Sequence, residues 1–113
     1  MNISTQDLNG ALVITLEEQR LDAAVALSFK EAVREALAEP GAPVILDMSR
    51  VDFLDSSGLG AVVAVMKLLG SDRRLELSGL TPNVAKVFRL TRMDTVFTLH
   101  DRLPERGASQ ATG

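Results

Sequence analysis

The chain opens with two short runs of strand-forming residues on either side of a turn signal. Residues 3–8 and 11–16 flank Asn9-Gly10, a dipeptide that accepts the positive φ angles of a tight type I′ turn. The pattern predicts a β-hairpin, in which the two runs pair as antiparallel strands.

A helical period follows the hairpin. Val25, Phe29, Val33 and Leu37 recur at four-residue steps, which places them on one face of a helix. We expect Asp22 to cap this helix, because its carboxylate can accept free backbone amides. The helix should run to about Ala38 and stop in the segment 39–43, which contains two prolines and a glycine.

Short apolar runs and helical segments alternate through the rest of the chain. Residues 44–46, 51–54, 75–77 and 96–99 predict strands, and the first is typical of a strand buried on both faces of a parallel sheet. Residues 58–69 predict a second helix, closed by Gly70. Thr81-Pro82 begins a third helix that should run to about Arg92, since threonine caps free amides and proline loses no hydrogen bond there.

Strands separated by helices imply parallel pairing with right-handed crossovers. The predicted fold class is therefore α/β. We expect a single small sheet, mixed but mostly parallel, which begins with the hairpin and carries about three to four helices. The residues of the last two helices that we assign to the core are Val62, Val65, Met66, Leu69, Val84, Val87, Phe88 and Thr91.

Size and composition favour one globular domain, since the chain has 113 residues, of which 46% are hydrophobic and 24% charged. We expect residues 1–103 to form this domain and residues 104–113 to be a frayed tail. The chain has no cysteine, so a disulfide or a thiolate metal site is excluded. We expect a cytoplasmic protein that does not insert into membranes, because no secretory signal is evident and the longest apolar run, residues 59–66, is far shorter than about 20 residues.

Charge argues against a nucleic-acid partner. The formal net charge is −3, and the basic clusters, Arg73-Arg74 and Arg89 with Arg92, are small. Phosphate backbones are held by larger groups of lysine and arginine. We interpret these clusters as solvated surface.

The candidate chemistry lies in the segment Asp55-Ser56-Ser57-Gly58-Leu59-Gly60, between a predicted strand and a helix. This place puts hydroxyls beside unpaired amides at the positive end of a helix dipole, where a phosphate on Ser57 is well tolerated. We expect the two glycines to let the backbone turn sharply and to leave the serine open to a kinase. The alternative is that Ser56 or Ser57 merely caps the helix.

Three catalytic or nucleotide-binding alternatives fit the sequence poorly. A receiver domain could hold Mg²⁺ on Glu17, Glu18 and Asp47, but the opening hairpin is wrong for that fold, and we expect these residues to be solvated strand ends. An esterase would need Gly-x-Ser-x-Gly, which the sequence lacks. The only histidine, His100, is expected at the surface. A phosphate-binding loop fails because Val63 stands where a third glycine is required. We expect no enzymatic activity and no cofactor.

The order from residue 44 to residue 69 resembles the signature of the STAS family, the anti-sigma factor antagonists. The specific part is Phe53-Leu54-Asp55-Ser56-Ser57-Gly58-Leu59-Gly60, followed by an Ala/Val helix. Leu21-Asp22-Ala23, Ser78-Gly79-Leu80-Thr81-Pro82 and residues 93–97 extend the match, so that it covers roughly residues 3–102. The chain departs from the family at Gln19 and at Arg92, where the family often has glycine.

The resemblance implies a phosphorylation-controlled partner switch. The serine before the glycine, here Ser57, would accept phosphate from an anti-sigma factor that is itself a serine kinase of the histidine-kinase-like ATPase type. A PP2C-type phosphatase would remove the phosphate. The unphosphorylated domain would bind the anti-sigma factor and free the sigma factor. The residues expected to contact the partner are Asp22, Asp55, Ser56, Ser57, Gly58 and Leu59.

Two questions stay open at this point. Asp22 fits both the kinase-binding role and a simple helix cap. Single STAS domains also serve as adaptors in other signalling or membrane-associated transport complexes, and some respond to small ligands.

If Ser57 is the acceptor, phosphate adds about 1.5 to 2 negative charges, and we expect it to change the interface while the fold stays nearly the same.

Overall fold

The structure, a computed structural model, describes residues 1–37, 41–71 and 73–103. The predicted tail, residues 104–113, lies outside these ranges. Asn9 and Gly10 adopt φ angles of 53° and 85°, as a type I′ turn requires. They join β1 (Ile3–Leu8) to β2 (Ala11–Leu16) as antiparallel strands, which confirms the predicted hairpin.

The main sheet has the order β1-β2-β4-β6-β7. Its central strand β4 (Val44–Asp47) pairs in parallel with β2 and with β6 (Leu75–Ser78), and β6 pairs in parallel with β7 (Thr98–His100). All of β4 is buried, as expected for a strand covered on both faces. The sheet is therefore mixed and mostly parallel, as predicted.

Two strand predictions are corrected. The last strand begins at Thr98 rather than at residue 96, because a short 3-10 helix η1 (Met93–Thr95) carries the chain back toward the sheet and leaves Val96 exposed. A second ladder also exists, in which β3 (Arg20–Leu21) pairs in parallel with β5 (Phe53–Leu54). The expectation of a single sheet is therefore wrong.

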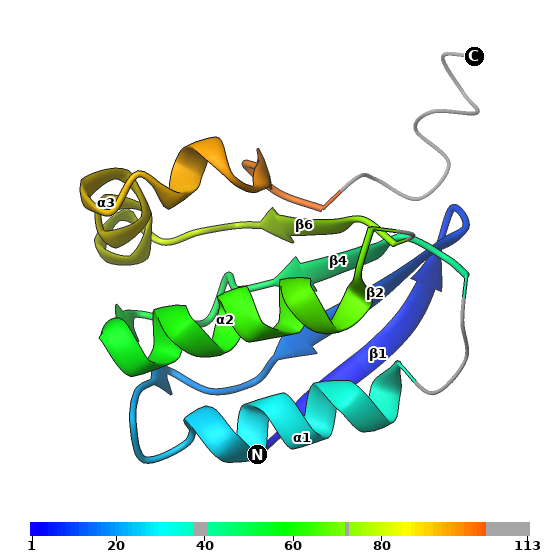
Figure 1. The fold of residues 1–113 in the computed structure, drawn as a ribbon, viewed down its shortest axis with the longest axis horizontal. Helices are drawn as coiled ribbons and strands as arrows, with labels where there is room; N and C mark the ends of the chain where they lie inside the picture. Colours follow the sequence, from blue (N-terminus) through cyan, green and yellow to red (C-terminus); the bar gives the residue numbers. More distant parts are fainter. Residues whose placement is uncertain (38–40, 72, 104–113) are drawn as a thin grey trace.

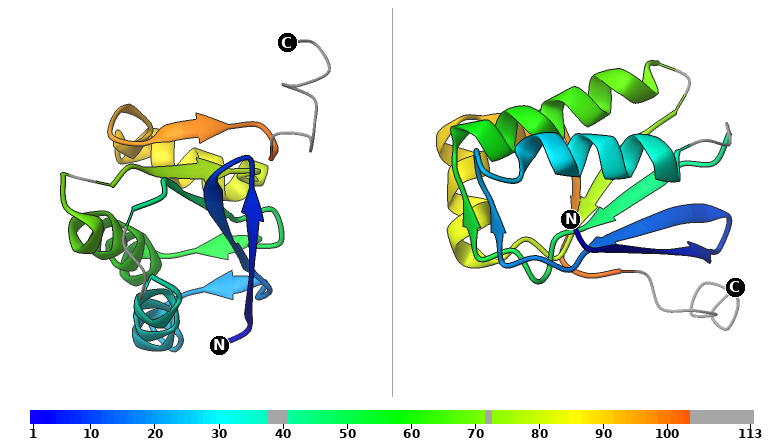
Figure 2. Two further views of the ribbon diagram at one scale, coloured as in Figure 1. Left: turned by 90° about the vertical axis from the view of Figure 1, so that its right-hand side faces the viewer. Right: turned by 90° about the horizontal axis from the view of Figure 1, so that it is seen from below.

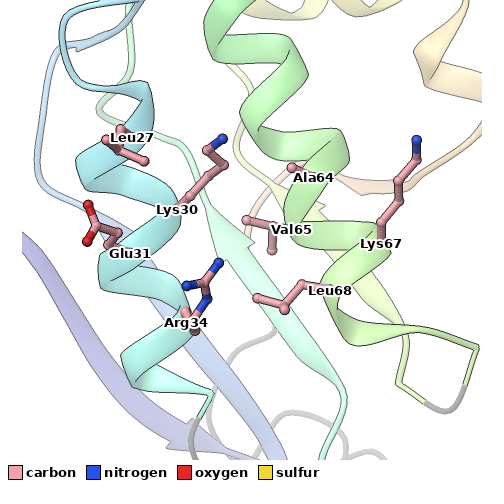
Figure 3. Close-up of a pocket in the computed structure, with 8 residues that line it drawn as sticks. All are labelled: Leu27, Lys30, Glu31, Arg34, Ala64, Val65, Lys67 and Leu68. Atoms are coloured by element: carbon pink, nitrogen blue, oxygen red, sulfur yellow. The ribbon is translucent and has the colours of Figure 1, made fainter.

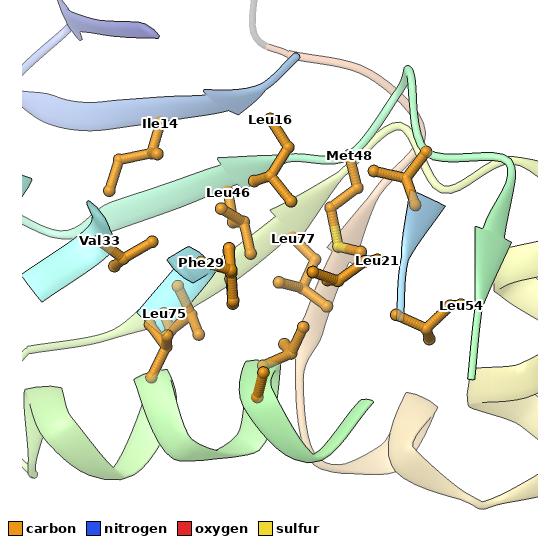
Figure 4. Packing of buried hydrophobic residues seen from close by; sticks show 14 of the residues in the cluster. Ile14, Leu16, Leu21, Phe29, Val33, Leu46, Met48, Leu54, Leu75 and Leu77 are labelled. Atoms are coloured by element: carbon orange, nitrogen blue, oxygen red, sulfur yellow. The ribbon is translucent and has the colours of Figure 1, made fainter. Parts of the chain in front are cut away.

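Helices α1 (Ala26–Ala36) and α2 (Ser56–Leu69) lie side by side on one face of the main sheet, and α3 (Pro82–Leu90) lies beyond the ends of β4 and β6 (Figures 1 and 2). Between them and the sheet is the main core, in which Phe29 and Val33 of α1 meet side chains of β2, β4 and β6 (Figure 4). Of the helices among the described residues, none is long and apolar enough to cross a membrane.

Most of the predicted core positions are confirmed. Phe29, Val33, Val62 and Val65 are buried, while Val25, Leu37, Met66 and Leu69 are half-buried and pack against them. In α3, Val84 and Phe88 are buried and Val87 is half-buried. Thr91 is an exception: it is exposed, and its hydroxyl donates to the carbonyl of Val87 at 2.7 Å.

The start of α1 and the end of α3 differ from the prediction. Helix α1 begins at Ala26 with Val25 as its N-cap residue, so Asp22 does not cap it. The Asp22 carboxylate instead accepts the Ala24 amide at 3.1 Å and closes a local turn that competes with the helix. Helix α3 ends at Leu90, two residues before Arg92, which adopts a left-handed φ of 62°. Glycine is favoured there, which gives a physical reason for the glycine that the STAS resemblance implies in place of Arg92.

Candidate functional site

The start of α2 is built around Asp55, which is the N-cap residue of the helix. One carboxylate oxygen, Oδ1, accepts the amide of Gly58 at 2.9 Å, and the other, Oδ2, accepts the amide of Ala23 at 3.3 Å. The same side chain therefore caps α2 and ties it to the turn after β3. The alternative in which Ser56 or Ser57 caps the helix is wrong.

Ser56 and Ser57 are the first two residues of α2, and both are exposed. Neither hydroxyl forms a hydrogen bond to a described residue. The first amides of a helix have no partner within it and give that end a partial positive charge. The site thus presents two uncommitted hydroxyls beside an electropositive backbone that favours a nearby anion.

Gly58 is essential to this arrangement for a reason that the sequence does not show. A Cβ added at Gly58 would lie 2.0 Å from the carbonyl oxygen of Leu21. Gly58 is buried within α2 and has no left-handed φ, so the expected sharp turn is not its role. It lets α2 touch the backbone of β3, and as a buried residue it offers little surface to a partner. Gly60, with open space around its Cβ position, has no such constraint.

The β3–β5 ladder adds a contact between Arg20 and Phe53 that the sequence did not predict. Arg20 lies opposite Phe53, and the carbon of its guanidinium is 4.2 Å from the centroid of the Phe53 ring, within cation–π range. Nε of Arg20 is also 3.2 Å from Oδ2 of Asp22. No local signal predicts this contact, because it depends on the pairing of two distant segments.

The structure brings most of the predicted site together. Asp22 stands next to Ala23, the residue whose amide binds Asp55, so its turn lies beside the start of α2. Phe53 is 40% exposed and borders the same region. Leu59 is half-buried and packs against the core, so only part of it is accessible. We call the exposed residues Arg20, Ala23, Phe53, Ser56 and Ser57, together with the half-buried Asp22, the α2-start surface.

The residues weighed for a magnesium site do not come together. Glu17 and Glu18 line one hollow, whereas Asp47 lines another. Asp47 is 8% exposed rather than a solvated strand end, because it accepts the Thr15 hydroxyl at 3.3 Å and the Ser49 amide at 3.0 Å. Within residues 1–37, 41–71 and 73–103, no three histidine, aspartate or glutamate side chains form a metal-binding group.

His100 has a structural partner on the sheet face opposite α1 and α2. Its Nε2 lies 2.5 Å from Oε1 of Glu76, on the neighbouring strand β6. The hydrogen bond from His100, helped by Arg74, holds the pKa of Glu76 below its ordinary value. His100 is therefore half-buried and paired, not a free surface residue.

Comparisons with known proteins agree with this geometry. The STAS domain profile matches residues 2–105. The anti-sigma-F factor antagonist RsfB of Mycobacterium tuberculosis is 26% identical over 107 residues, which cover 91% of this chain and 87% of RsfB.

Two solved structures show the same fold. A STAS domain protein from Planctomyces limnophilus superimposes with a TM-score of 0.81 at 21% identity, over 89% of this chain and 91% of that one. The phosphorylated form of SpoIIAA, a Bacillus cell fate determinant, superimposes with a TM-score of 0.64 at 22% identity, over 99% of this chain and 100% of that one. Because the STAS domain profile matches residues 2–105 of this 113-residue chain, the chain belongs to the STAS domain family.

Proposed function

We propose that this protein is an anti-sigma factor antagonist whose partner binding is controlled by phosphorylation of Ser57. The observation that carries the proposal is the uncommitted Ser57 hydroxyl, exposed at the start of a helix that Asp55 already caps. Support also comes from RsfB, a relative named as an anti-sigma-F factor antagonist, and from a solved phosphorylated form of SpoIIAA.

Ser57 is preferred over Ser56 on the strength of the family motif, since both hydroxyls are exposed. A phosphate on Ser57 would lie at the positive end of α2, which offsets part of its charge. No hydrogen bond of the described fold would be lost, because the Ser57 hydroxyl makes none. Phosphorylation should therefore leave the domain folded.

The effect of phosphate falls on the partner. The unphosphorylated α2-start surface offers two serine hydroxyls and the Phe53 ring with Arg20 over it to an anti-sigma factor. Phosphate adds about 1.5 to 2 negative charges next to Asp55 and beside the turn of Asp22. A partner that packs on a neutral hydroxyl would then have to accommodate a hydrated anion, and the complex would dissociate.

The partner in this scheme is an anti-sigma factor with serine kinase activity of the histidine-kinase-like ATPase type. A PP2C-type phosphatase would reset the switch, and the cycle would take place in the cytoplasm. The domain itself would act by binding rather than by catalysis, without a cofactor and without contacting nucleic acid.

Phosphorylation in vitro tests the site. The full chain is incubated with a candidate anti-sigma factor kinase and ATP, and the phosphate is located by mass spectrometry. We expect one phosphate on Ser57, none on Ser57→Ala, and normal labelling of the matched control Ser56→Ala. Phosphate on Ser56, or undiminished labelling of Ser57→Ala, would contradict the assignment.

Measuring the affinity for the anti-sigma factor tests the effect of a negative charge at Ser57. Ser57→Asp should weaken binding of the anti-sigma factor by about tenfold or more, since a like or unpaired charge in an interface costs more than 1.4 kcal/mol. Ser56→Asp should weaken binding less if Ser57 is the switch. The circular dichroism spectrum of Ser57→Asp should match that of the parent chain, and an unfolded variant would mean that the serine is structural.

A further inference from the structure

A groove runs between α1 and α2, on the side of the helices that faces away from the sheet (Figure 3). Its volume is about 550 Å³. It lies along the second half of α2, from Ala64 to Leu68, whereas Ser57 is at the start of that helix. At 1.5 Å per residue, Ala64 is about 10 Å further along the helix than Ser57. On α2 the groove is therefore separate from Ser57, while on α1 its lining begins at Leu27, four residues after Ala23.

The floor and rim of the groove are apolar. Val65 forms the floor and is 1% exposed, while Leu27 of α1 and Leu68 of α2 are 65% and 46% exposed at the rim. A single exposed leucine is ordinary on a protein surface. Two of them on facing helices, above an apolar floor, give a channel into which apolar side chains of a partner can insert.

Basic side chains line this apolar channel. Lys30 and Arg34 extend from α1 toward α2, whereas Lys67 projects from the side of α2 that faces away from α1 (Figure 3). The acidic side chain in the lining is Glu31, which projects from α1 away from α2. None of the three cations forms an ion pair with a described residue. The groove is thus locally positive on a chain whose net charge is −3.

We propose that this groove docks an acidic amphipathic helix of a partner protein. Leucine-like side chains on one face of that helix would contact Leu27, Val65 and Leu68. Glutamate or aspartate side chains on its flanks would pair with Lys30, Arg34 and Lys67, which have no partner among the described residues. The charge complementarity selects an acidic helix over a basic one.

Because the groove is distant from Ser57, binding in it should depend little on phosphorylation of that serine. A Debye length of about 8 Å at physiological salt screens charges that are about 10 Å or more apart at the surface. Phosphate on Ser57 should therefore change binding in the groove little. The protein would hold one partner at the groove in both states of the switch, while the α2-start surface binds or releases another.

A designed peptide tests the proposal on the full chain. The probe is a fluorescein-labelled helical peptide of about 18 residues, or five turns, with leucines along one face and glutamates on its flanks. A second peptide has lysine in place of every glutamate. We expect fluorescence anisotropy to show saturable binding of the acidic peptide, much weaker binding of the basic peptide, and a loss of affinity as salt rises.

Matched variants locate the binding. Lys30→Glu combined with Arg34→Glu should weaken binding of the acidic peptide by about tenfold or more. Lys86→Glu, a charge reversal at an exposed position of α3, should weaken it much less. Leu68→Ser should weaken it severalfold, whereas Leu90→Ser, at a residue of α3 that is 74% exposed, should not.

Several results would overturn the proposal. Equal binding of the acidic and basic peptides, or equal losses in groove and control variants, would exclude the groove as the site. A dimer in sedimentation velocity that Leu68→Ser abolishes would assign the groove to a second copy of the chain. Binding to phosphatidylglycerol vesicles without binding to the peptide would assign it to a lipid surface. Ser57→Asp should leave peptide binding unchanged, so a result that contradicts docking in the groove can be distinguished from one that contradicts the Ser57 switch.

Discussion

The starts of α2 and α3 both follow a polar residue, but the two polar side chains form different hydrogen bonds. Each begins after a polar residue suited to capping, Asp55 in one case and Thr81 in the other. Asp55 turns its carboxylate to the amides of Gly58 and Ala23. Thr81 makes no cap bond, and its hydroxyl donates instead to the carbonyl of Val51 at 2.7 Å. The hydroxyl at α3 is therefore structural.

The comparison shows when a hydroxyl at a helix start is available for chemistry. At α2 the aspartate satisfies the backbone, so the serine hydroxyls that follow stay uncommitted and exposed. At α3 the helix begins with Pro82, which has no amide to satisfy, and the threonine is used to hold the loop after β4. A hydroxyl at a helix start is thus available for chemistry only where neither the helix cap nor a neighbouring segment uses it.

Gly58→Ala should have the largest effect, because it forces a methyl group into the carbonyl of Leu21 and separates α2 from β3. We expect a loss of at least about 3 kcal/mol in the free energy of unfolding, measured by urea denaturation. The matched control is Gly60→Ala, which meets open space within the same helix and should stabilise the protein by about 0.5 to 1 kcal/mol. Similar effects of the two variants would contradict the close approach at Gly58.

Asp55→Ala should have the next largest effect, since it leaves the amides of Gly58 and Ala23 without their partner. The expected loss is about 1 to 2 kcal/mol in the free energy of unfolding. Asp52→Ala removes an exposed carboxylate from the same segment and should change stability by less than about 0.5 kcal/mol. If both variants behave alike, Asp55 is not the cap.

Thr81→Val keeps the shape of the side chain and removes the hydrogen bond to Val51. We expect a loss of about 1 kcal/mol, because the carbonyl of a buried residue loses its donor. Thr91→Val is the control, since that hydroxyl bonds the carbonyls of its own exposed helix end. A larger loss for Thr91→Val than for Thr81→Val would reverse the assignment of the structural hydroxyl.

Ser57→Ala should have the smallest effect on stability, within about 0.5 kcal/mol of the parent chain, because the hydroxyl is exposed and uncommitted. Thermal unfolding followed by circular dichroism measures it. A loss as large as that of Thr81→Val would show that the two hydroxyls are equally structural and would remove the basis of the comparison.

Local features could be predicted because the interactions that determine them lie within a few residues. The Asn9-Gly10 turn depends on the φ angles that these two residues tolerate. The stripe from Val25 to Leu37 follows from the helical period. Even the helix after Asp55 was predicted to within two residues of its start.

Contacts between distant segments could not be predicted in this way. The Arg20–Phe53 pair, the burial of Asp47 and the hydrogen bond of Thr81 to Val51 all join elements that are far apart in sequence. The Asp22 cap was mispredicted because a local turn competes with the helix for the same carboxylate. The groove between α1 and α2 likewise exists only when the two helices pack together.

By itself, the sequence determined the α/β class, the hairpin, the three helices and the segment in which a phosphate acceptor would lie. Only the tertiary structure decided which residue caps α2, why Gly58 must lack a side chain, and which hydroxyls are committed. The physical reason is that turns and helical stripes are properties of neighbouring residues, whereas caps, close approaches and exposure depend on which backbone the folded chain brings alongside.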